Sequence, residues 1–148
     1  MTVHKRPISV LVVIHSPEWN ILLLERASHV GYWQSVTGSQ EDNESLSETA
    51  QREVREETGI DADPEQIIDW HLSHRFEIFT EWRHRYAPGI THNTEHVFSL
   101  EVPTGQPICI APDEHLNFQW LPWREAAEKC FSWSNRDAIL MLPEKNTR

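Results

Sequence analysis

Apolar residues gather in short runs that polar turns separate, a pattern typical of alternating strands and helices. Segments 8–14 and 21–26 are apolar, and the polar stretch 16–20 between them contains Pro17 and Asn20, as a turn does. Further strands are predicted at 33–37, at 66–80 as one or two strands, at 94–102 and, as a last edge strand, at 116–121.

The clearest helical signal covers residues 45–58. Leu46, Ala50 and Val54 recur at helical spacing, a serine at the start can cap the helix, and Gly59 follows its end. This segment should therefore pack one narrow apolar face against the rest of the protein.

Two shorter helices are predicted at 122–130, opened by a proline at its first turn, and at 135–142, with Pro143 just beyond its end. Because strands and helices interleave, we expect the α/β (α+β) class. A chain of 148 residues with 39% apolar content can bury a sizeable core, so we expect one domain over residues 1–148.

The predicted helix 45–58 also carries Glu53 and Glu57, which lie beside its apolar stripe and lean inward. Side chains four residues apart are neighbours on a helix, so these carboxylates repel each other, more strongly if they are partly buried. Carboxylate oxygens suit Mg²⁺ or Mn²⁺, and a bound ion would remove the conflict. The alternative is a solvated acidic helix face paired with Arg52 and Arg55.

Residues 38–60 match a longer acidic signature. Gly38 is followed after five residues by Glu44 and after seven more by the string REVREETGI at 52–60. This string is the Nudix box, so the chain resembles the Nudix hydrolases. The resemblance favours the metal role of the carboxylates, and it implies an α/β/α sandwich around a mixed β-sheet. It also implies hydrolysis of a diphosphate linkage in a nucleoside-diphosphate-like substrate.

Segments outside the box narrow the resemblance to the bacterial branch of this family that acts on dihydroneopterin triphosphate in folate synthesis. They are WQSVTG at 33–38, FEIF at 76–79, RHRYAPG at 83–89, NTE at 93–95, EHL at 114–116 and SWSNR at 132–136. The likeness covers nearly the whole chain. It implies Mg²⁺-dependent cleavage between the α and β phosphates, giving dihydroneopterin monophosphate and pyrophosphate.

Position by position, the resemblance implies that Glu53, Glu57 and Glu114 bind Mg²⁺, with Mn²⁺ as a possible substitute. We assign Glu56 as a supporting ligand, and Glu53 or Glu114 as the acceptor of the proton from the attacking water. Arg52 is expected to orient the carboxylates through ion pairs. The implied substrate-binding residues are Lys5, Arg26, Thr37, Phe76, Glu77, Ile78, Phe79 and Ser132.

These substrate residues can also be given a chemical role of their own. Lys5 and Arg26 are cations available to phosphate oxygens. Phe76 and Phe79 offer flat faces to a pterin ring, and Glu77 or the backbone beside it could meet the amino and amide edge of the ring. The structural alternatives are solvated surface cations and core aromatic residues, and for the acid at 114 an ordinary turn residue or helix cap.

Composition excludes several other functions. The net charge is −10, so general nucleic-acid binding is not expected, and no segment is long enough to cross a bilayer. The two cysteines, Cys109 and Cys130, form no metal or disulfide motif and suit a reducing cytoplasm. The apolar run 8–14 is too brief for a signal peptide. The expected partner is a small molecule, either a pterin or a nucleoside triphosphate, and the oligomeric state is not determined by the sequence.

Two alternative functions remain open. A house-cleaning pyrophosphatase acting on dATP or oxidised purine nucleotides would use the same carboxylates, because purines and pterins are both fused, amide-bearing heterocycles. A catalytically silent binding module of the same fold would be expected to lack the carboxylates of the box, and this chain has them.

Overall fold

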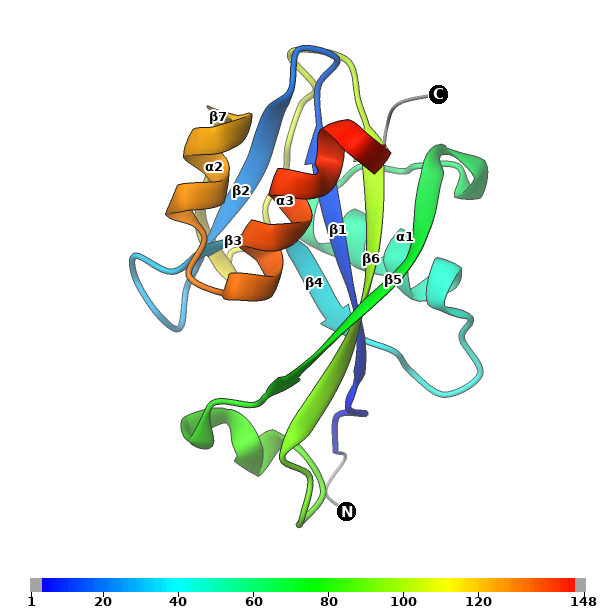
Figure 1. Ribbon diagram of the computed structural model, residues 1–148, viewed down its shortest axis with the longest axis vertical. Coiled ribbons are helices and arrows are strands. Elements are labelled where there is room, and N and C mark those ends of the chain that lie inside the picture. The colour runs from blue at the N-terminus through cyan, green and yellow to red at the C-terminus, as the bar shows by residue number, and fades with distance from the viewer. Residues whose placement is uncertain (1–3, 146–148) are drawn as a thin grey trace.

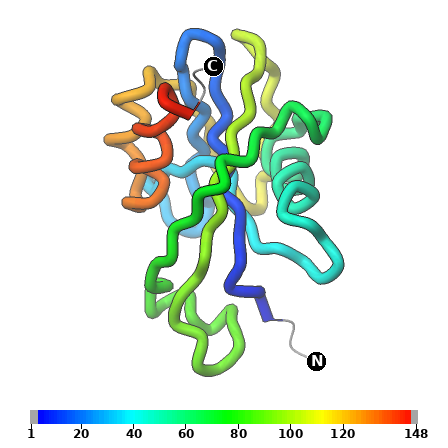
Figure 2. Tube along the Cα trace, turned by 45° about the vertical axis from the view of Figure 1, so that its right-hand side comes forward, coloured from blue at the N-terminus to red at the C-terminus, as the bar shows by residue number. Residues whose placement is uncertain are grey.

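The computed structural model describes residues 4–145, and its strands form one mixed sheet with helices on both faces (Figures 1 and 2). The elements follow in the order β1 (Ile8–His15), β2 (Asn20–Arg26), β3 (Trp33–Gln34), β4 (Val36–Ser39), α1 (Leu46–Thr58), η1 (Pro64–Gln66), β5 (Ile67–Glu77), η2 (Thr80–Arg85), β6 (His92–Glu101), β7 (His115–Pro122), α2 (Trp123–Lys129) and α3 (Trp133–Lys145). The predicted α/β class is confirmed.

Strand β1 lies at the centre of the sheet. On one side it pairs in parallel with β6 along its whole length, and β5 continues the sheet antiparallel to β6. On the other side it pairs with β4 through residues 9–12 and with β2 only at His15. The strands β4 and β2 therefore pair with different parts of β1, β4 with its first half and β2 with its last residue.

Alternate residues of β1 point to opposite faces and build two separate cores. Val10 and Val12 pack with α1, whose stripe contributes Ala50 and Val54. On the other face, the intervening leucine and valine of β1 pack with α2 and α3. Figure 2 shows α1 on one side of the strands and α2 with α3 on the other, which is the α/β/α sandwich expected from the Nudix resemblance.

Helix α1 has the predicted ends. The Ser45 hydroxyl accepts a hydrogen bond from the Glu48 backbone, and the Glu48 carboxylate accepts one from the Ser45 backbone, so the two form a capping box. At the other end Gly59 adopts a left-handed conformation with φ of 77°, which glycine accepts without strain. Local sequence therefore fixes both boundaries of the helix that carries the acidic signature.

Two predicted boundaries are wrong. The strand expected at 33–37 is interrupted at Ser35, whose backbone N–H donates to the Asn135 side chain at 2.8 Å, so β3 pairs with β2 and β4 with β1. Helix α3 begins earlier than predicted and continues through Pro143. Pro143 has no N–H for the carbonyl of Ile139, and the Trp123 indole donates to that carbonyl instead, at 2.5 Å.

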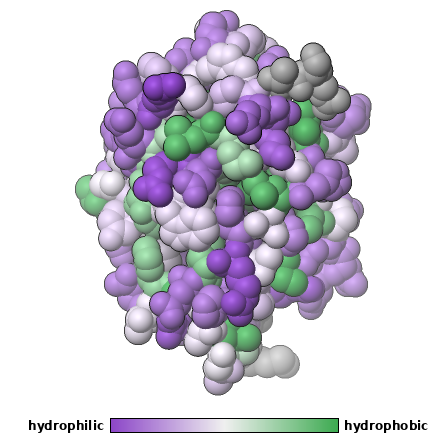
Figure 3. All heavy atoms as spheres, viewed as in Figure 1, coloured by the Kyte–Doolittle hydropathy of each residue, from purple (hydrophilic) through white to green (hydrophobic). Residues whose placement is uncertain are grey.

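The strands β5 and β6 extend beyond the helical layers and carry η2 at their far end (Figure 1). The β5 strand is irregular between Asp69 and Ser73, where His71 has a positive φ of 53°. In the view of Figure 3, hydrophobic side chains are dispersed among hydrophilic ones. None of the helices within residues 4–145 has the length and apolar character needed to span a membrane.

Candidate active site

A cavity of about 1100 Å³ opens on the side of the sheet where β1, β4 and β6 meet the start of α3. Its lining also includes the end of α1, residues of η2 and the turn before β7. This volume is large enough for a drug-sized ligand with several phosphate groups. Every substrate and metal residue predicted from the sequence lines this one cavity.

The carboxylate of Glu53 enters the cavity across the edge of the sheet, because Gly38 has no side chain there. A Cβ atom at position 38 would lie 1.3 Å from Glu53 Oε2, 2.1 Å from its Cδ and 2.7 Å from its Cγ. The glycine is thus required for a close approach rather than for a positive φ. This contact joins Gly38, the first residue of the acidic signature, to Glu53 on the helix.

Arg52 holds the carboxylates of the signature in place. Its guanidinium donates to Glu44 from Nε at 2.6 Å and from Nη2 at 3.0 Å, to Glu53 at 2.9 Å, to Glu56 at 3.0 Å and to the Ser39 carbonyl at 3.1 Å. Hydrogen bonding from Arg52 lowers the pKa of Glu44 to about 2. One planar cation therefore orients three acids at once, as the sequence predicted for Arg52.

Glu57 is the most deeply buried acid of the group, at 2% exposure, and is hydrogen-bonded to Glu53. Burial, together with the charges of Glu53 and Glu114, raises the pKa of Glu57 well above its usual range. Burial likewise raises the pKa of Glu53 to about 7, against the opposing effect of Arg52. His115 Nε2 lies 3.6 Å from Glu57 Oε1, and burial lowers the pKa of His115 to about 4, so this histidine is neutral.

These carboxylates suit a hard divalent cation. Within residues 4–145, Glu57 Oε1 is buried and accepts no hydrogen bond, although it faces other acids. A cation there would relieve both the repulsion and the missing partner. No three acidic, histidine or cysteine side chains of the described chain converge into a ready-made coordination shell. Glu114 acts on Glu53 and Glu57 through its charge, and Glu56 remains bonded to Arg52.

Three cations gather near the carboxylates. The Lys5 backbone donates to the Arg85 carbonyl at 2.8 Å, which places the two residues side by side. Desolvation, then Arg85 and Arg26, lower the pKa of Lys5, and desolvation and Arg85 lower the pKa of Arg26. Across the described residues none of the three forms a salt bridge, so their charge is available to an anion.

Aromatic rings form part of the cavity wall. Phe79 packs against Trp82 with ring centroids 5.0 Å apart, and both approach Phe131, which stacks on Tyr32 at 4.8 Å. The Arg26 guanidinium lies over the Trp82 ring at 4.7 Å. These contacts tie η2 to the loop before β3 and to the loop before α3. Trp82 thus belongs to the cavity.

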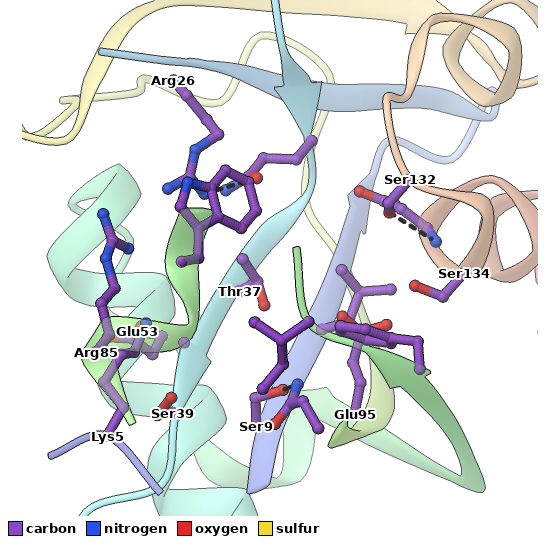
Figure 4. A pocket seen from close by; sticks show the side chains of 18 of the residues that line it. Lys5, Ser9, Arg26, Thr37, Ser39, Glu53, Arg85, Glu95, Ser132 and Ser134 are labelled. Carbon is purple, nitrogen blue, oxygen red and sulfur yellow. Dashed lines mark hydrogen bonds between the residues drawn. The ribbon is translucent and has the colours of Figure 1, made fainter. Parts of the chain in front are cut away.

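The remaining predicted substrate residues all line the cavity, but the Glu77 carboxylate is already paired with another residue. Thr37 lies in the middle of the cavity, where its hydroxyl donates to the Val10 carbonyl at 2.9 Å (Figure 4). Ser132 accepts a hydrogen bond from the Asn135 backbone, and Phe76 and Ile78 also line the wall. The Glu77 carboxylate is 69% exposed and pairs with Arg83 at 3.2 Å, so it is engaged elsewhere.

The structure adds residues that the sequence analysis did not assign. Arg85 joins the cations, and Asn93 and Glu95 line the opposite end of the cavity. Figure 4 shows Lys5, Arg85 and Glu53 at one end and Glu95 with its neighbouring serines at the other, with Thr37 between them. Arg85, Asn93 and Glu95 fall in segments that resemble the family, but only the fold brings Arg85 beside Lys5 and Glu95 beside Ser9.

Comparison with known proteins places this fold and cavity in a family. The profile of the NUDIX domain matches residues 5–142. Dihydroneopterin triphosphate diphosphatase of Escherichia coli (strain K12) is 47% identical over 140 residues, which cover 93% of this chain and 92% of that protein. The Haemophilus influenzae protein of the same name is 39% identical over 142 residues, covering 94% and 89%.

Solved structures agree with these matches. The structure of the E. coli dihydroneopterin triphosphate pyrophosphohydrolase superposes with a TM-score of 0.87 at 47% identity, covering 93% of this chain and 95% of that one. A C. elegans Ap4A hydrolase gives a TM-score of 0.71 at 17% identity, covering 93% and 95%, and shares the fold alone. The chain that combines this sandwich, cavity and acidic signature belongs to the Nudix hydrolase family.

Proposed function

We propose that this protein hydrolyses dihydroneopterin triphosphate in the presence of Mg²⁺, giving dihydroneopterin monophosphate and pyrophosphate, a step of folate biosynthesis. The bacterial relatives that carry the name dihydroneopterin triphosphate diphosphatase align with nearly all of this chain. One structural observation carries the proposal: a single cavity has acids and cations at one end and polar side chains, among them Ser132 and Glu95, at the other. Residues 1–148 would act as one catalytic domain.

The acidic end would hold the divalent ion. Glu53, Glu57 and Glu114 are the proposed ligands, Glu56 is a supporting ligand, and Mn²⁺ is a possible substitute. When bound, Mg²⁺ neutralises phosphate oxygens and lowers the pKa of a water molecule. Arg52 keeps the Glu53 carboxylate oriented through its hydrogen bond of 2.9 Å.

The reaction joins the oxygen of a water molecule to phosphorus at the α–β anhydride and breaks the bridging P–O bond. Glu53 or Glu114 takes the proton that the water releases. The electron pair of the broken bond leaves with the pyrophosphate. Lys5, Arg26 and Arg85 neutralise the negative charge that grows on this leaving group, since none of them forms a salt bridge with an acid within residues 4–145.

The other end of the cavity would bind the pterin. A triphosphate held by the cations can extend past Thr37 toward the start of α3, where Ser132 offers a hydroxyl. Phe76 and Phe79 supply apolar faces along the way. This orientation keeps the reactive anhydride at the acids and the ring away from them.

Product analysis tests this function. The purified protein is incubated with Mg²⁺ and, in separate reactions, with dihydroneopterin triphosphate, dATP, dGTP and an oxidised purine nucleotide, and pyrophosphate is distinguished from orthophosphate. We expect pyrophosphate, and the highest kcat/KM on the pterin. A higher kcat/KM on a nucleotide would make the protein a house-cleaning pyrophosphatase. No phosphate product on any substrate, with Mg²⁺ or Mn²⁺, would make it a binding module.

A further inference from the structure

Glu95 is a buried carboxylate that the proposed reaction does not use. It lies on β6 directly beside Ser9 of β1 and is 6% exposed. Its side chain lines the cavity at the end opposite Glu53 (Figure 4). Within residues 4–145 it forms no salt bridge, so no cation explains its burial.

Acceptor atoms around Glu95 are left without donors. The Ser134 hydroxyl is its hydrogen-bond partner, but Glu95 Oε1 is buried and accepts nothing from the described residues. Asn93, two residues earlier on the same face of β6, donates to Ser9 Oγ at 2.7 Å, while its own Oδ1 accepts no hydrogen bond from residues 4–145. Two unsatisfied acceptors therefore lie in one wall of the cavity, where a missing hydrogen bond is unfavourable.

The buried side chain of Asn135, next to Ser134 in the sequence, is fully hydrogen-bonded within the protein and serves as a comparison. Asn135 Oδ1 accepts from the Ser35 backbone at 2.8 Å, and Asn135 Nδ2 donates to the Ser35 hydroxyl at 3.0 Å. That side chain is complete within the protein, and it fixes the break between β3 and β4. Glu95 differs because its remaining oxygen finds no such partner in the part of the chain that the structure describes, so a ligand has a place to bind.

The missing partner must be a donor, and a carboxylate best accepts two donors side by side. The aminopyrimidinone ring of a pterin presents such a pair, the exocyclic amino group and the adjacent ring N–H. We propose that Glu95 binds this edge of the pterin and thereby selects the substrate, with Asn93 Oδ1 as a second acceptor. This inference rests on the proposed function.

The order of residues along the cavity agrees with this assignment. With its phosphates at Lys5 and Arg85 and its chain passing Thr37, a bound molecule would direct its ring toward Glu95. Phe76 lies beside Asn93 in the sheet, and Trp133 also lines the cavity. Burial raises the pKa of Glu95 to about 7, with Ser134 opposing the shift, so the ionised form is accessible near neutral pH.

Substitution of Glu95 by glutamine tests the inference, because an amide offers one acceptor and one donor instead of two acceptors. Adenine presents one donor and one acceptor at its corresponding edge, so glutamine suits adenine and opposes the pterin. We expect E95Q to lower the ratio of kcat/KM on dihydroneopterin triphosphate to kcat/KM on dATP by about 10- to 150-fold, as loss of hydrogen bonds to a charged group does. E101Q, the same change at the exposed end of β6, should leave the ratio unchanged.

A binding measurement separates this inference from the proposed function. Neopterin, which has the same ring edge but no phosphate, is titrated against wild-type protein and E95Q without metal, and its fluorescence reports binding. We expect at least tenfold weaker binding to E95Q. Equal effects of E95Q on both triphosphates, or neopterin binding no tighter in wild type than in E95Q, would overturn the role of Glu95. Wild-type protein that binds neopterin but hydrolyses nucleotides faster would count against the proposed function alone.

Discussion

Replacing Gly38 by alanine should disable the site while leaving the fold intact. The new Cβ would lie 1.3 Å from Glu53 Oε2, whereas real contacts of this kind begin near 3.0 Å, so the carboxylate must move by about 1.7 Å. The side chain of Glu53 can move because its end is flexible, and φ at position 38 is not in the left-handed region. A misplacement of about 1 Å at a reacting group can reduce activity about 100-fold, so G38A should lose at least that much kcat/KM.

The assay is pyrophosphate release from dihydroneopterin triphosphate with saturating Mg²⁺, and thermal unfolding measures the fold. A double-mutant cycle provides the control. If G38A acts through the carboxylate, it should have little further effect in an E53A background, where the displaced group is absent. Full activity of G38A, or an equal loss with and without Glu53, would refute the reasoning.

Three further predictions concern the acids and their partners. E57Q should be at least as stable as wild type in EDTA, because it removes a buried repulsion, and its Tm should not rise with Mg²⁺; a rise equal to that of wild type would contradict the ligand role. R52K should lose about 1.5 to 3 kcal/mol of unfolding free energy in urea, since lysine cannot hold Glu44 and Glu53 together; unchanged stability would show that the network contributes little. The folded pKa of Glu95, about 7, lies above its ordinary 4.5, so its stabilising contribution is present below pH 4.5 and is lost as pH rises through 7. Wild type should therefore lose up to about 3 kcal/mol between pH 4.5 and 8 relative to E95Q in urea titrations, and parallel pH profiles would contradict this.

The fold was predictable where local signals were complete. Helix α1 has its cap, apolar stripe and terminal glycine within one short segment, so its boundaries follow from the sequence. The break at Ser35 depends on Asn135, 100 residues away, and the passage of α3 through Pro143 depends on the Trp123 indole. Hydrogen bonds between residues far apart in the sequence leave no local sequence pattern. The predicted boundaries of β3, β4 and α3 were therefore wrong.

The site was predictable to a similar extent. The acidic signature pointed to Glu53 and Glu57, and the structure brings them together in a cavity with Lys5 and the other expected residues. Glu77, expected at the edge of the ring, pairs with Arg83 instead. Glu95 could not be distinguished from any other acid of an amphipathic strand, because its isolation becomes visible only when β6 lies beside β1.

The projecting β5–β6 hairpin carries residues that would contact the substrate, and it lies apart from the helix that carries the metal-binding acids. Glu53, Glu56 and Glu57 belong to α1, which packs against the sheet, whereas Arg85 and Trp82 come from η2, which the hairpin carries outside the layers (Figure 1). Changes in the length of that hairpin would alter which molecules can be held without moving the acids of α1. Differences in substrate preference among proteins of this architecture are therefore expected to concentrate in this outlying ribbon rather than in α1.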